Sequence, residues 1–129
     1  MKKFFILVVF SLVTLFSYSQ VSEKQGITKA IQEGNAKALG GYFTKTVDLT
    51  VKDVEDVYSK EQAEVILTRF FDENKTKTYT VKHEGKSKLD DYYYIGDLVT
   101  STGTYRLTFF LKKDGEVFRV KQLRIENGE

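Results

Sequence analysis

Cysteine is absent from this chain of 129 residues, and histidine occurs only once, at position 83. Without cysteine the protein forms no disulfide, so its stability must come from the packing of a hydrophobic core. Structural zinc sites are built from several cysteine and histidine ligands, and a thiol nucleophile is itself a cysteine. The composition therefore excludes both kinds of site, and no motif implies a cofactor.

The chain also lacks an excess of charge once its first residues are set aside. Its formal net charge is +2, and Lys2 and Lys3 account for all of it. Residues 20–129 are therefore neutral overall. This balance removes the main argument for binding nucleic acid or an anionic membrane surface.

The N-terminal apolar run is too short to span a bilayer comfortably as a helix. Phe4–Phe16 has 13 residues, where about 20 are needed. The run follows two lysines and precedes the small-x-small triplet Ser17-Tyr18-Ser19, a combination typical of a secretory signal peptide. We expect cleavage after Ser19 and a single exported domain over residues 20–129, either periplasmic or secreted. A membrane anchor is the alternative.

The domain is expected to begin with two short helices. Ser22 and Gln25 fit a capping box, apolar residues then recur at helical spacing, and Gly34 supplies a stop, which predicts a helix over residues 23–33. Asn35 can cap a second helix that runs through Leu39.

A change of period follows these helices. Apolar and polar residues alternate over residues 47–52, which predicts a half-buried strand, and a brief second strand is expected over residues 54–58. Ser59 and Gln62 repeat the capping box ahead of an apolar helical stripe. Asn74-Lys75-Thr76 matches a glycosylation sequon, but an ordinary helix end is the favoured interpretation because the tripeptide is frequent by chance.

From Thr76 onward the sequence predicts four strands and no further helix. Asp114-Gly115 indicates a two-residue hairpin turn. With that turn, Phe109 faces Val120 and Leu111 faces Phe118, and the four side chains form one buried apolar patch.

A β-bulge is expected in the last strand. The apolar positions slip from Val120 to Leu123, a spacing of three where two or four would keep one face. One inserted residue near Lys121-Gln122 explains the slip. The sequence therefore predicts an α+β fold in which N-terminal helices pack on a strongly curved antiparallel sheet, whose concave face is the usual place for a small ligand.

Four stretches carry a resemblance to a known family: "GNAKALGGYF", "YSKEQAEVILTRFF", "YIGDLVTSTGTYRLTF" and "LRIE". Together with the order of elements, they resemble the nuclear transport factor 2-like (SnoaL-like, cystatin-like) cone fold and, more narrowly, a family of small secreted Bacteroidota proteins whose function is not established. The resemblance covers essentially all of residues 20–129. It implies a fold and an exported location, but this fold hosts isomerases, dehydratases, ligand carriers and structural dimers, so it does not select a function.

His83 and Asp97 are the candidate catalytic pair. His83 shares strand parity with Tyr79 and Val81 and is expected to point inward. Asp97 matters because isomerases that this fold resembles use an inward carboxylate, but its direction depends on the turn at Gly103. A two-residue loop sends Asp97 outward, and a three-residue loop sends it inward.

Three functions are considered. The leading hypothesis is a secreted, non-catalytic domain that binds a small apolar ligand or a partner protein on the concave face. One alternative is an acid–base isomerase or dehydratase that uses His83 and Asp97. The other is a homodimer-forming module. The aromatic and imidazole side chains proposed as ligand contacts are Tyr42, Tyr58, Tyr79, His83, Tyr93 and Tyr105. The dimer hypothesis rests on the threonines Thr78, Thr80, Thr100, Thr102, Thr104 and Thr108.

Overall fold

The computed structural model describes residues 21–128, so the predicted signal peptide lies outside the described residues. Within that range no helix is both long and apolar enough to cross a membrane. The helices are α2 (Glu23–Glu33), α3 (Ala36–Gly40) and α4 (Lys60–Glu73). The strands are β1 (Phe43–Val51), β2 (Val54–Ser59), β3 (Thr76–Lys86), β4 (Tyr92–Thr100), β5 (Gly103–Asp114) and β6 (Val117–Asn127).

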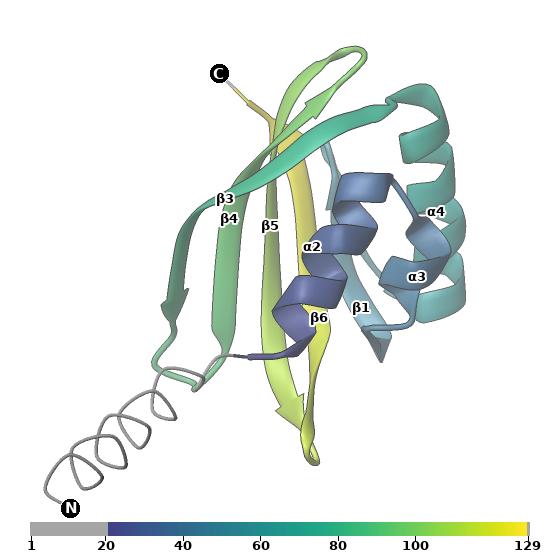
Figure 1. Cartoon of the computed structure of the whole chain (residues 1–129). Coiled ribbons are helices and arrows are strands. Elements are labelled where there is room, and N and C mark those ends of the chain that lie inside the picture. The colour runs from purple at the N-terminus through teal and green to yellow at the C-terminus, as the bar shows by residue number, and fades with distance from the viewer. Residues whose placement is uncertain (1–20, 129) are drawn as a thin grey trace, which may run out of the picture.

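The strands form one six-stranded sheet in the order β2-β1-β6-β5-β4-β3. The three helices lie on one face of this twisted sheet (Figure 1). The predicted α+β architecture is confirmed, with one correction: β1 and β6 run parallel, whereas all other neighbours are antiparallel. The parallel pair arises because the C-terminal strand inserts between the β1–β2 hairpin and β5, and its direction is set by its own hairpin with β5.

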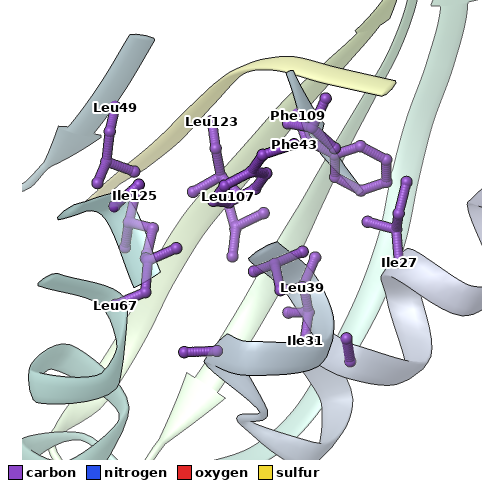
Figure 2. Packing of buried hydrophobic residues seen from close by; sticks show 14 of the residues in the cluster. Ile27, Ile31, Leu39, Phe43, Leu49, Leu67, Leu107, Phe109, Leu123 and Ile125 are labelled. Atoms are coloured by element: carbon purple, nitrogen blue, oxygen red, sulfur yellow. The ribbon is translucent and has the colours of Figure 1, made fainter. Parts of the chain in front are cut away.

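A hydrophobic core joins the helices to the inner, helix-covered face of the sheet (Figure 2). Its largest side chains are at most 1% exposed. Burial of these apolar side chains stabilises the domain. They are Phe43 and Leu49 of β1, Leu98 of β4, Leu107, Phe109 and Leu111 of β5, Leu123 and Ile125 of β6, and Ile27, Ile31, Leu39 and Leu67 of the helices.

One of the two predicted capping boxes is present. At α4 the Gln62 N–H donates to the Ser59 hydroxyl, and the Ser59 N–H donates to the Gln62 side chain, each at 3.2 Å. The box predicted at α2 is wrong, because Ser22 already has a helical conformation and its hydroxyl donates to Glu23 at 2.9 Å. Gly34 ends α2 in a left-handed conformation, as predicted.

Asn74 ends α4 and is only 4% exposed. Its side-chain nitrogen donates to the Phe70 carbonyl at 2.8 Å, and its side-chain oxygen accepts a hydrogen bond from Tyr105 at 3.2 Å. The favoured interpretation of the sequon as a helix end is therefore confirmed. A glycan would have to be attached to a buried, hydrogen-bonded nitrogen.

The β5–β6 hairpin confirms the bulge but corrects the turn. The loop is Gly115-Glu116, not Asp114-Gly115, because Asp114 pairs with Val117 and the positive φ of 67° falls on Gly115. The two-residue shift places Leu111 opposite Val120 and leaves every side chain on its predicted face. Phe110 then pairs with Gln122, so Lys121 is the inserted residue.

The β4–β5 hairpin decides the direction of Asp97. Thr100 pairs with Gly103, which leaves a two-residue loop of Ser101 and Thr102, so the turn lies just before Gly103 and not at Gly103 as expected. This is the loop length that sends Asp97 outward. Asp97 is exposed, whereas its neighbour Leu98 is completely buried on the inner face.

Candidate functional site

His83 and Asp97 do not meet on the concave face. The expectation that His83 points inward is wrong, because β3 carries a bulge between Val81 and His83 that the alternation did not reveal. Val81 pairs with Gly96, but His83 pairs with Ile95, so its side chain lies on the outer face and is exposed. Asp97 is exposed on the same outer face. The concave face therefore lacks the oriented pair that the acid–base alternative needs.

Two of the candidate tyrosines are buried on the inner face with their hydroxyls engaged by the protein. Tyr79 donates to the Leu107 carbonyl at 3.0 Å, and Tyr105 donates to Asn74 at 3.2 Å. Burial, with a smaller contribution from the charge of Asp97, raises the pKa of Tyr79 well above its usual value. Both rings pack as part of the core.

The other three candidate tyrosines lie at separate places. Tyr42 is partly buried with its ring across Gly26 of α2, and Tyr58 pairs with Val47 near the end of β2. Tyr93 points to the outer face, where its ring lies 6.1 Å from that of Phe110. These tyrosines and His83 are not gathered into one site.

The threonines proposed for dimer packing do not all share a face. Thr100 is buried on the inner side, and Thr102 lies in the β4–β5 loop. Pairing with outward residues places the remaining four on the outer face: Thr78, Thr80, Thr104 and Thr108. Homodimer formation through this face stays a prediction.

A pocket of about 490 Å³ opens at one end of the inner face. The residues that line it belong to the first turn of α2 and the chain just before that helix, to the end of β3, and to the starts of β4 and β6. Its lining residues are Val21, Lys24, Glu84, Gly85, Lys86, Tyr92, Tyr94 and Phe118.

The β3–β4 register assembles most of this pocket. Glu84 pairs with Tyr94, and Lys86 pairs with Tyr92, so two charged and two aromatic side chains share the inner face at the end of the sheet. Alternation along β4 sends the intervening Tyr93 to the other side. The bulge in β3 sets this parity, because without it Glu84 and Lys86 would point outward.

Aromatic rings form the apolar wall. The Tyr92 ring meets Phe118 edge to face, with centroids 5.3 Å apart and an interplanar angle of 83°. Tyr94 stacks on the buried Phe109 at 4.9 Å. Burial, followed by the charge of Glu84 and smaller effects of Tyr92 and Glu23, raises the pKa of Tyr94 to about 12. Its hydroxyl is therefore a neutral hydrogen-bond donor near neutral pH.

Charged groups surround the mouth of the pocket. Lys24 forms an ion pair with Glu84 at 2.8 Å and places its Nζ 5.2 Å from the centroid of the Tyr94 ring. Lys86 lies over Tyr92 at 5.6 Å and reaches Asp90 at 3.4 Å. The mouth thus combines cations, carboxylates and aromatic faces. Within residues 21–128, no cluster of histidine, aspartate or glutamate has the arrangement of a metal site.

Comparison with known proteins identifies the family. Residues 24–126 match the model of a domain of unknown function, DUF4783. The chain belongs to the DUF4783 family. A DUF4783 family protein from Bacteroides fragilis YCH46 has a crystal structure with a TM-score of 0.76 and 30% identity, over 80% of this chain and 96% of its own. The DUF4783 family protein from Bacteroides uniformis ATCC 8492 has the same TM-score and identity, over 81% of this chain and 96% of its own.

More distant structures show the fold alone. An NTF2-like protein of unknown function from Cytophaga hutchinsonii is 12% identical, with a TM-score of 0.57, over 84% of this chain and 91% of its own. These matches confirm the resemblance to the nuclear transport factor 2-like fold. Among curated proteins, none matches this DUF4783 chain.

The pocket of this DUF4783 domain contains none of the six predicted ligand contacts. Sequence reasoning missed it because its walls come from segments nearly a hundred residues apart and depend on the β3–β4 register. The available signal was the run Tyr92-Tyr93-Tyr94, in which two rings of three must share a face. Choosing Tyr93 from that run selected the ring on the opposite face.

Proposed function

We propose that this domain is an exported, non-catalytic binding domain that takes a small, largely apolar ligand into the pocket beside α2. The observation that carries the proposal is the convergence of Tyr92, Tyr94 and Phe118 on a cavity of about 490 Å³. Ligand pockets in proteins commonly have volumes of about 300–1,000 Å³ and combine apolar walls with a few polar groups. The pocket has both features.

The polar groups favour binding over proton transfer. A general base must be free to accept a proton from the substrate, but the Glu84 carboxylate is held by Lys24 at 2.8 Å. Tyr94 is a weak acid with a raised pKa, which suits it to donating a hydrogen bond and not to losing a proton. These groups orient a ligand more readily than they transform one.

Binding of a neutral fluorescent probe, N-phenyl-1-naphthylamine, tests the proposal. We expect saturable binding to the purified domain, weakened about tenfold by Tyr92→Ala, because such a loss corresponds to roughly 1.4 kcal/mol of aromatic contact. Val57→Ala is the matched control, since Val57 is 62% exposed on β2 and does not line the pocket. Mass spectrometry of material co-purified with the domain would then search for the natural ligand.

Two results would overturn the proposal. One is an absence of probe binding, and the other is equal binding by the wild type and Tyr92→Ala when circular dichroism shows both to be folded. Turnover of a small substrate that disappears on replacement of His83 or Asp97 would instead favour the acid–base alternative.

A further inference from the structure

We propose that the ligand of this pocket is an amphipathic anion, with an apolar body against the aromatic wall and one negatively charged group at the mouth. This inference rests on the proposed function and adds the chemical class of the ligand. It follows from which hydrogen-bonding groups at the mouth are engaged and which are free.

The acceptors at the mouth already have donors. Glu84 accepts from the Lys24 ammonium at 2.8 Å. Glu23, which lies beside the pocket, accepts from the Phe118 N–H at 3.3 Å and from the Ser22 hydroxyl at 2.9 Å. Part of the hydrogen-bonding capacity of each carboxylate is therefore already used, so a cationic or donor-rich ligand would gain less from pairing with either one than from pairing with a carboxylate that has no partner.

The hydrogen-bond donors at the mouth, in contrast, have a weak partner or none. Lys86 forms an ion pair with Asp90 at 3.4 Å, but the Asp90 side chain is 85% exposed, and such surface pairs contribute little. Within the described range 21–128 the Tyr94 hydroxyl makes no hydrogen bond, although Tyr94 is only 4% exposed. An incoming anionic group would find both donors available, and a charged donor gives the stronger hydrogen bond.

The surroundings of the aromatic rings also favour a negatively charged ligand over a positively charged one. A ring face attracts cations, but Lys24 lies over Tyr94 at 5.2 Å and Lys86 lies over Tyr92 at 5.6 Å. These lysines occupy the positions that a ligand ammonium would seek and would repel it. A wholly apolar ligand would in turn partly desolvate Lys86 without giving it a partner.

A pair of probes separates charge from apolar contact. 1-Anilinonaphthalene-8-sulfonate carries a sulfonate on the same ring system that N-phenyl-1-naphthylamine presents without charge. We expect the sulfonate probe to bind about tenfold more tightly to the wild-type domain. Lys86→Gln should remove most of that advantage and change the affinity for the neutral probe less than twofold.

Two further variants sharpen this test. Tyr94→Phe keeps the ring and removes the hydroxyl, so it should weaken the sulfonate probe about threefold and leave the neutral probe unchanged, which is the scale of one hydrogen bond. Lys112→Gln is the control, because Lys112 is an exposed lysine outside the pocket, opposite Arg119. It should change neither affinity.

The outcomes distinguish the two proposals. Equal affinities for the two probes, or a sulfonate affinity that Lys86→Gln leaves intact, would overturn the anionic ligand and leave the binding pocket standing. The same conclusion follows if Lys112→Gln weakens the sulfonate probe as much as Lys86→Gln does. Failure of both probes to bind would overturn the proposed function and this inference with it.

Discussion

Tyr79 fills the inner face of the sheet in front of Gly96. A Cβ on residue 96 would lie 2.8 Å from the Tyr79 ring and 2.5 Å from the Thr80 carbonyl oxygen. The ring cannot move away easily, because the Tyr79 hydroxyl donates to the Leu107 carbonyl and the Tyr79 backbone N–H donates to the Gln32 side-chain oxygen at 2.7 Å. Glycine at position 96 is therefore explained by the close approach of an aromatic ring and a neighbouring strand.

Gly96→Ala should destabilise the domain by about 1–3 kcal/mol, the usual cost of overpacking a core. Urea unfolding followed by circular dichroism measures the change. Gly41→Ala is the matched control, because Gly41 has φ −62° and its nearest obstacle is the Ala38 carbonyl at 3.3 Å. A loss from Gly96→Ala no larger than that of the control would show that the Tyr79 contact adapts without strain.

The two bulged strands show what periodicity can and cannot reveal at the scale of an element. In β6 the apolar residues on both sides of Lys121 are buried, so the inserted residue appears in the sequence as a spacing of three between Val120 and Leu123. In β3 the residues beyond the bulge are polar and include His83 and Glu84. Polar residues occur on either face of an edge strand, so their parity carried no information about the insertion.

The helix caps could be predicted from the sequence, whereas the pocket could not, because caps depend on nearby residues and the pocket depends on strand register. Caps at Asn35 and Ser59 depend on residues within one helical turn, and both were correctly predicted. The pocket depends on strand register, which is set by packing between strands and not by local sequence. Tyr92, Tyr94 and Phe118 therefore come together only when the whole sheet is assembled.

The β5–β6 hairpin gives a prediction about unequal burial on one face. Phe109 is completely buried, whereas Phe118 is only partly buried at the pocket, which corrects the expectation that all four side chains of the apolar patch are buried. Phe109→Ala should destabilise by about 3–5 kcal/mol, the usual range for a buried aromatic residue. Phe118→Ala should cost roughly half as much, because part of its ring is already in contact with solvent.

Chemical denaturation of both variants against the wild type measures this difference. The Phe118 variant should also lose affinity for the neutral probe, because its ring lines the pocket. Equal destabilisation by the two substitutions would mean that Phe118 is as well covered as Phe109 and that the pocket is closed in solution.

At the scale of the whole molecule, the fold could be predicted more fully than the function. The order of elements and four short stretches indicated a nuclear transport factor 2-like domain, and the structural match to the NTF2-like protein from Cytophaga hutchinsonii agrees. A fold specifies where a concave face lies but not which side chains occupy its open end. Here those side chains are Lys24, Glu84, Lys86 and the aromatic residues of β4 and β6, which only the assembled structure brings together.

The prediction of export rests on Lys2, Lys3, the apolar run Phe4–Phe16 and the Ser17-Tyr18-Ser19 triplet. Expression of all 129 residues in a Gram-negative host should yield a periplasmic or secreted protein whose N-terminal sequence begins at Gln20. A double variant, Ser17→Leu with Ser19→Leu, should block cleavage, because the processing site requires small residues at these two positions. Intact Met1 in a washed membrane fraction of the unmodified protein would identify the segment as an anchor.

Because Val21 lines the pocket, cleavage after Ser19 would leave a single residue before the pocket wall, and the uncleaved variant would keep residues 1–19 attached at that point. We therefore expect the processed protein to bind the neutral probe at least as tightly as the uncleaved variant.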